Sequence, residues 1–122
     1  MVQQALQEKA QTIYDLIRRE FGEVKLLERD PVISTIGTAD DTFLRASSSR
    51  VWFAFVNLSA NVMFIRPRRA AATTAGLRAG PNGGGWILYW KEDGPLPSLE
   101  WHVIADAGAG NQFFVLALEI SP

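Results

Sequence analysis

The sequence predicts a mainly β domain, an antiparallel β-sandwich of jelly-roll-like form or a small barrel, preceded by one N-terminal α-helix. Apolar residues alternate with a period of two in several short runs after residue 31, and glycine, proline and asparagine separate these runs. The first 28 residues follow the helical spacing instead. With 122 residues, 48% of them hydrophobic, the chain fits one domain with its own core. We therefore expect a helix over residues 1–28 and a β-sandwich domain over residues 29–122.

Charge and cysteine content restrict the chemistry. The net charge is −1, so the total charge points neither to nucleic acid nor to an anionic membrane. The absence of cysteine excludes disulfides, thiolate metal sites and cysteine nucleophiles. No apolar run approaches the roughly 20 residues that span a bilayer, and the first residues lack the pattern of a secretory signal. We expect a soluble chain without a processed leader.

One apolar stripe marks the N-terminal segment. It recurs at spacings of four and seven residues, at Leu6, Ile13, Ile17 and Phe21. A lone helix before an all-strand chain packs either on its own domain or on a neighbouring subunit, so these four residues are a candidate assembly interface. Gly22 interrupts the pattern, and Glu23 to Arg29 is expected to continue as a helical turn or as a short strand before Pro31.

The stretch from Arg50 to Arg66 predicts a central hairpin. Residues 51–56 (VWFAFV) and 62–65 (VMFI) alternate with a period of two, and both faces of each run are apolar. The polar residues between them, Asn57, Ser59 and Asn61, supply turn chemistry. Because a strand without a polar face is covered on both sides, we expect these arms to lie between two packed layers.

Shorter runs predict the other strands. Residues 32–36 and 42–45 come before the hairpin, and a small strand is expected around Thr73 to Leu77. Three later strands are expected over residues 86–91, 99–105 and 113–120. The last one has apolar residues on both faces, which is typical of a buried closing strand.

Four arginines gather in and beside a loop of low hydrophobicity, residues 67–85. They are Arg66, Arg68, Arg69 and Arg78. A guanidinium group matches carboxylate or phosphate, although solvated loop charge is the plainer interpretation. An acidic protein surface suits this loop better than nucleic acid, because aromatic residues that would stack on bases are missing. The glycine-rich run from Gly80 to Gly85 lacks the lysine and the following helix of a phosphate-binding loop, so we expect a turn.

Three tryptophans could lie on adjacent strands and stack on a sugar: Trp86, Trp90 and Trp101. Packing in the core is the alternative, since their alternation matches that of neighbouring apolar residues. Exposure of the rings separates the two interpretations.

No combination of residues predicts catalysis. Ser47 to Ser49 lack a nucleophile-elbow motif and are far in sequence from His102, the chain's one histidine. A cupin-type metal site needs several histidines, so an enzyme of that kind is disfavoured. We expect no enzymatic activity, no cofactor and no metal site.

Three runs share an ordered pattern: VWFAFVNLSANVMFIRP, TTAGLRAGPNGGGWILYW and NQFFVLALEI. A strand ending in N-x-S precedes a short strand, then a T-x-x-G-[IL] segment leads to an aromatic strand, and an apolar strand closes the chain. Thr74, Gly76, Leu77 and Gly80 stand at the matching loop positions, whereas the loop arginines go beyond the pattern. Over residues 50 to 120 the chain thus resembles small structural proteins of tailed bacteriophage virions. The resemblance implies an oligomeric β-sandwich used as a capsid decoration, head-fibre or tail-associated part.

The leading hypothesis is therefore a non-enzymatic structural component of a phage virion, such as a capsid decoration or cement protein, assembled in the host cytoplasm. Its expected partners are further copies of itself, for example in a trimer, and virion proteins such as the major capsid protein. Membrane and nucleic acid are not expected partners. The alternative is a carbohydrate-binding module for receptor or glycan adhesion.

Overall fold

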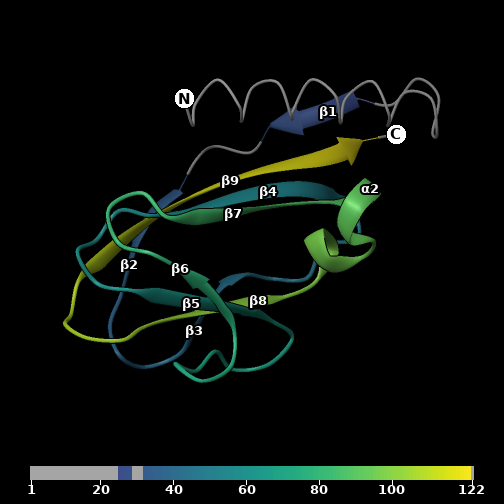
Figure 1. Cartoon of the computed structure of the whole chain (residues 1–122). Coiled ribbons are helices and arrows are strands. Elements are labelled where there is room, and N and C mark those ends of the chain that lie inside the picture. The colour runs from purple at the N-terminus through teal and green to yellow at the C-terminus, as the bar shows by residue number, and fades with distance from the viewer. Residues whose placement is uncertain (1–24, 29–31, 122) are drawn as a thin grey trace.

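Two antiparallel sheets packed face to face form the domain (Figure 1). The computed structural model describes residues 25–28 and 32–121. The first sheet contains β1 (Lys25–Glu28), β2 (Val32–Ile36), β4 (Arg50–Asn57), β7 (Gly85–Tyr89) and β9 (Asn111–Ser121). The second contains β3 (Asp41–Leu44), β5 (Met63–Pro67), β6 (Leu77–Ala79) and β8 (Trp101–Ala105). The predicted mainly β sandwich is confirmed.

The long strand β9 organises the first sheet. The strand order is β1-β9-β4-β7, and β2 also pairs with β9 beside β1. The second sheet has the order β3-β8-β5-β6. Between β7 and β8 the chain forms a helical turn, α2 (Trp90–Asp93), and a 3₁₀ turn, η1 (Leu96–Ser98). All these strand pairs are antiparallel, so the strands can be joined by short turns.

The N-terminal helix is predicted for residues 1–28. Residues 1–24 of this segment lie outside the described residues. The backbone of Lys25–Glu28 forms β1, which pairs with the end of β9. Of the two alternatives for residues 23–29, the short strand is therefore the one found at residues 25–28.

The predicted hairpin between β4 and β5 is wrong, because the two strands lie in different sheets. β4 pairs with β7 and β9, whereas β5 pairs with β6 and β8. The chain crosses from one sheet to the other between Asn57 and Met63. Both runs are apolar on two faces, but the neighbours that hydrogen-bond with them come from later in the chain, where local spacing gives no information.

The Asn57 side chain holds this crossing. It is fully buried, and its Oδ1 accepts hydrogen bonds from the backbone N and the Oγ of Ser59 at 2.9 and 2.8 Å. Its Nδ2 donates to the carbonyl oxygens of Asn61 at 2.7 Å and Ala79 at 3.1 Å. Ala79 belongs to β6, so one amide group ties the end of β4 to the second sheet with its full set of donors and acceptors in use.

Several strand boundaries also differ from the prediction. The strands expected at residues 42–45, 99–105 and 113–120 are β3 (Asp41–Leu44), β8 (Trp101–Ala105) and β9 (Asn111–Ser121). Two more differ as follows. The small strand expected at residues 73–77 is β6, which begins only at Leu77, since Ala72 and Ala75 close a turn by bonding each other. The strand expected at residues 86–91 ends at Tyr89, and Trp90 starts α2. At this boundary Asp93 Oδ2 accepts a hydrogen bond from the Tyr89 backbone N at 3.0 Å.

Apolar side chains fill the space between the sheets and also cover the outer face of the first sheet. In the inner cluster Phe43 contacts Phe55 and Phe113, with ring centroids 5.2 and 5.8 Å apart. The outer cluster centres on Trp52, which is 1% exposed, with Ala54 and Leu118 beside it. The prediction that both runs are covered on both sides is confirmed for β4, whereas in β5 Phe64 and Arg66 are only partly buried.

Replacing Phe55 by alanine should lower the free energy of unfolding by about 3–5 kcal/mol, because a fully buried ring is lost and its cavity remains. Urea unfolding measures this change. Leu58→Ala is the control: this side chain is 45% exposed, so its loss should cost about 1 kcal/mol or less. Equal losses for the two variants would contradict the assigned core.

Candidate functional site

Three of the four predicted loop arginines lie together in a tight turn at the end of β5. We call residues 66–69 the arginine turn. Pro67 pairs with Trp101 as the last residue of the strand. The backbone N of Arg68 donates to the Glu100 carbonyl at 2.7 Å, and that of Arg69 donates to the Pro67 carbonyl at 2.9 Å. The second bond closes a three-residue γ-turn around Arg68, whose φ of 68° is uncommon for a residue with a side chain.

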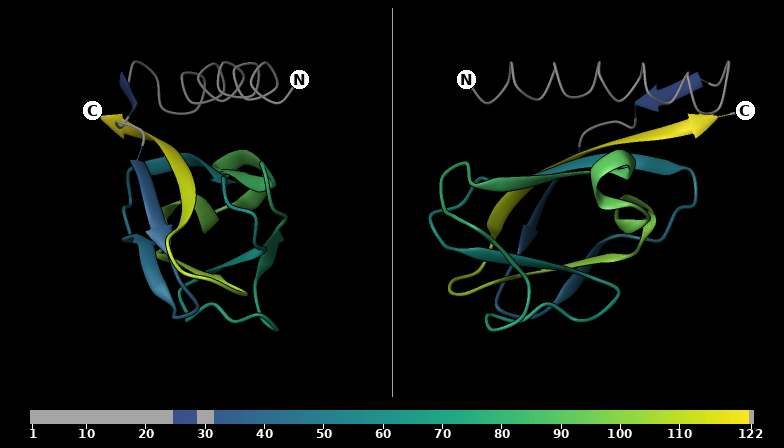
Figure 2. Two further views of the ribbon diagram at one scale, coloured as in Figure 1. Left: turned by 90° about the vertical axis from the view of Figure 1, so that its left-hand side faces the viewer. Right: turned by 45° about the vertical axis from the view of Figure 1, so that its right-hand side comes forward.

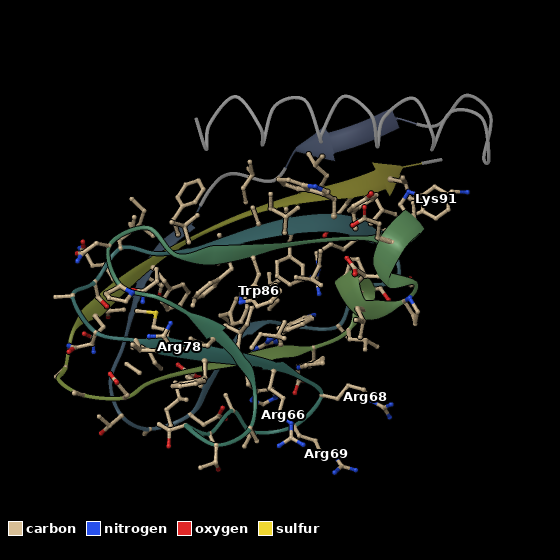
Figure 3. All side chains as sticks on the ribbon, viewed as in Figure 1. Arg66, Arg68, Arg69, Arg78, Trp86 and Lys91 are labelled. Atoms are coloured by element: carbon tan, nitrogen blue, oxygen red, sulfur yellow. The ribbon has the colours of Figure 1, made fainter. Side chains whose placement is uncertain are left out.

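A hollow of about 320 Å³ is lined by the four residues of the arginine turn. Figure 3 shows the side chains of Arg66, Arg68 and Arg69 gathered at one corner of the domain. Within the described part of the chain, none of them has an ion pair or a side-chain hydrogen bond. Among the described residues the turn therefore presents positive charge without an ion-pair partner, on a backbone fixed by hydrogen bonds.

Arg78 does not join this group. It lies on β6, opposite Phe64, and points away from the arginine turn (Figure 3). Its carbonyl accepts a hydrogen bond from the indole Nε1 of Trp86 at 2.9 Å. The cluster predicted from sequence is thus divided into a group of three and a separate arginine.

Arg50, which the sequence did not indicate as a site residue, is buried and bonds the backbone of a neighbouring segment. It is 5% exposed, and its Nε and Nη2 donate to the carbonyl oxygens of Pro97 and Leu99 at 2.7 and 2.6 Å. Burial lowers the pKa of Arg50, while the charge of Glu119 acts in the opposite direction. This arginine fastens η1 to β4 and is not available to a ligand.

A carboxylate–histidine clasp, formed by Asp40, Glu100 and His102, lies beside the arginine turn. His102 is opposite Arg66 on the neighbouring strand. Its Nδ1 is 2.9 Å from Asp40 Oδ2, and its Nε2 is 2.7 Å from Glu100 Oε1. Asp40 Oδ1 also accepts a hydrogen bond from the backbone N of Ala71 at 2.7 Å. The Glu100 carbonyl accepts a hydrogen bond from the backbone N of Arg68, and the Asp40 carboxylate accepts one from that of Ala71. The residues of the clasp therefore hold the chain within the turn and just after it.

Electrostatics favour the charged form of His102. Burial alone lowers its pKa, but the hydrogen bonds and charges of Asp40 and Glu100 outweigh burial and raise the pKa above its ordinary value. An imidazolium can donate from both nitrogens to the two carboxylates. No sequence signal predicted this group, because Asp40 and His102 are 62 positions apart.

The tryptophans do not form one exposed row. Trp101 is fully buried, and its Nε1 donates to the Leu96 carbonyl at 2.8 Å. Trp90 lies on α2, half-buried against the outer cluster, and Lys91 Nζ is 5.5 Å from its ring centroid. Trp86 is 38% exposed. Trp101 therefore has no ring face available for a sugar, since it fills the core between the sheets.

The structure does not describe the predicted N-terminal assembly interface. The candidate assembly residues of the N-terminal stripe lie outside the described residues: Leu6, Ile13, Ile17 and Phe21.

The serine run is part of a local hydrogen-bond group, since Ser47 Oγ is 3.2 Å from Ser49 Oγ and 3.4 Å from Glu119 Oε1. In the described residues no group of three His, Cys, Asp or Glu side chains could hold a metal ion. None of the described helices is both long and apolar enough to cross a membrane.

The clasp makes stability depend on pH. A pKa that is raised on folding stabilises the protein below the pKa of free histidine, about 6.5. That contribution is lost as pH rises through the raised value. Urea unfolding should therefore show that His102→Gln lowers stability more at pH 6 than at pH 9. Thr73→Ala, in an exposed turn, is the control. An equal effect of His102→Gln at both pH values would contradict a charged clasp.

Comparison with protein-family models, curated proteins and solved structures finds no match. The resemblance to virion proteins of tailed bacteriophages stays a prediction from the sequence motifs between residues 50 and 120. The arrangement of charge and apolar surface on the sandwich is the independent source of argument about function.

Proposed function

We propose that this chain is a non-enzymatic structural protein that docks on an acidic protein surface through the arginine turn and associates with further copies of itself. The single observation that carries the docking part is the set of three arginines on one fixed turn, which have no ion pair within the part of the chain that the structure describes. On the basis of the sequence resemblance, we place it on a tailed-phage virion. There it would be a capsid decoration or cement protein, or another head- or tail-associated part, with the major capsid protein as one partner. The jelly-roll form and the leading helix belong to this proposal.

The geometry of the turn suits carboxylates. Each guanidinium presents a planar fork of donors that matches a carboxylate with two parallel hydrogen bonds. The γ-turn and the bond from Arg68 to Glu100 fix the backbone, so less conformational entropy is lost when a partner binds. Unpaired charges at the rim of an interface also steer the approach of an oppositely charged surface.

A protein partner fits better than a nucleic acid. The hollow is lined by Arg66, Pro67, Arg68 and Arg69, so it offers no aromatic ring for stacking on a base. The chain as a whole has a net charge of −1, which weakens attraction to a polyanion with uniformly spaced phosphates. A local basic turn on a nearly neutral molecule favours a partner with a local acidic patch.

The glycan-binding alternative gains less support. It needs a row of exposed rings, and of the three candidate tryptophans Trp101 is buried while Trp90 is half-buried against the outer cluster. Trp86 also uses its indole N–H within the chain. One partly exposed ring is a small platform for a sugar.

Replacing all three arginines of the turn by glutamine should weaken binding to poly-L-glutamate at least about tenfold, since each lost charged pair is worth on the order of 1 kcal/mol. Titration calorimetry at two salt concentrations measures the change and its salt dependence. Arg78→Gln is the matched control and should bind as the unaltered protein does. Absence of binding by the unaltered protein, or equal loss in the control, would contradict docking through the turn.

If the chain is a virion component, it should be present in purified particles of the tailed phage whose genome carries its gene. Mass spectrometry of particles banded in a density gradient should then find it at a fixed ratio to the major capsid protein. Presence in the infected-cell lysate together with absence from banded particles would contradict the virion assignment. That result would leave docking through the arginine turn unaffected.

A further inference from the structure

The strand β2 occupies an open edge of the first sheet. Among the described strands it pairs with β9 alone, and no backbone hydrogen bond joins it to a strand on its other side. The end-on view in Figure 2 shows β2 and β3 on the same side of the sandwich, one in each sheet. A free edge presents a row of N–H and C=O groups that can pair with another strand.

The other edges carry features that discourage such pairing. β1 has only four residues, and the register of β3 shifts between Thr42 and Leu44. β6 has three residues, and its middle one is Arg78. The indole of Trp86 on β7 reaches across to β6. By contrast, β2 reads VISTI and contains no charge, proline, glycine or bulge. It is the least protected edge in the described part of the chain.

A cavity lies next to this edge. Its volume is about 140 Å³, and it opens between β2 and β3. Its apolar lining residues are Ile36, Phe43, Leu44, Val103, Phe113 and Val115, and its polar ones are Ser34, Thr35, Asp41 and Thr42. A strand added beside β2 would place alternate side chains over this cavity. Main-chain pairing combined with a side-chain pocket is the usual mode of strand addition.

Apolar surface continues across the same edge. Ile33 is 63% exposed and stands opposite Phe114 of β9, which in turn stands opposite Val56 of β4. Leu58, 45% exposed, follows β4 directly. Phe114 and Val56 are partly buried. This apolar row extends the outer cluster of the first sheet to the free edge.

We infer that β2 pairs antiparallel with β2 of a second copy, so that the two first sheets become one continuous sheet across a two-fold axis. The inference deepens the self-association part of the proposed function and rests on it. A second copy is the occupant that these features favour, because β2 itself carries no charge, and pairing about Ser34 sets Ile33 of each copy opposite Thr35 of the other. The apolar rows then meet at the axis, and two-fold closure leaves neither β2 edge free.

Light scattering on the full chain tests the pairing. The unaltered protein should have twice the chain mass and Ile33→Lys the single mass, because its ammonium groups would lie beside the axis. Thr73→Lys adds the same charge on an exposed turn and should stay dimeric. Circular dichroism checks that the variants are folded, as expected for a change at an exposed position. A monomeric unaltered protein would overturn the inference together with self-association.

A cysteine placed at the axis gives a second readout. The chain has no cysteine, so Ser34→Cys introduces a unique thiol. Directly opposed residues in antiparallel strands have Cα atoms about 4.5–5.5 Å apart, within disulfide range. Mild oxidation should convert Ser34→Cys to a covalent dimer, whereas Thr73→Cys should remain largely uncrosslinked. A trimeric mass, or a dimer that persists in Ile33→Lys without crosslinking at residue 34, would overturn the β2 pairing but leave self-association in place.

Discussion

The buried amide of Asn57 is the interaction on which the two-layer structure depends. The chain leaves the first sheet at this residue and enters the second at Met63, and the amide bonds both the crossing segment and β6. The network extends through Asn61, whose Nδ2 donates to Asn111 Oδ1 at 2.8 Å. Asn111 in turn donates to the Ile36 carbonyl at 3.0 Å. A buried network of this kind stabilises one arrangement, because any other leaves polar groups unsatisfied at a cost of about 1–3 kcal/mol each.

With one end of the sandwich fixed in this way, the other end is free to carry exposed charge. β5 runs from the crossing to the arginine turn, and Arg50 and the carboxylate–histidine clasp fasten the segments around it. Function residing on a turn held by a rigid sheet is the common arrangement in β domains. The turn remains unpaired in the described part of the chain, although carboxylates of the clasp lie close by, because these carboxylates already bond His102 and Ala71.

The first sheet is apolar on its outer face as well as on its inner face. β4 and β9 bury side chains on both faces, so the sheet needs cover on its outer side as well as its inner side. The row through Ile33 and Phe114 continues that outer face to an edge without charge. Docking through the arginine turn and pairing through β2 would use different surfaces, so a self-associating protein could present several turns to a larger particle at once. Linked weak sites bind far more tightly than one site alone.

The sequence by itself determined the class of the domain, the positions of most strands and the burial of β4 on both faces, because a period of two and apolar composition are local properties. It also indicated the arginine-rich loop and the polar residues that follow β4, Asn57, Ser59 and Asn61. Only the tertiary structure decided that β4 and β5 lie in different sheets. It also decided that Arg78 lies away from the other three loop arginines and that Asp40 bonds His102. These outcomes depend on which strands pair across long separations, and the free energy of that pairing comes from packing and hydrogen bonds between residues that no spacing along the chain relates.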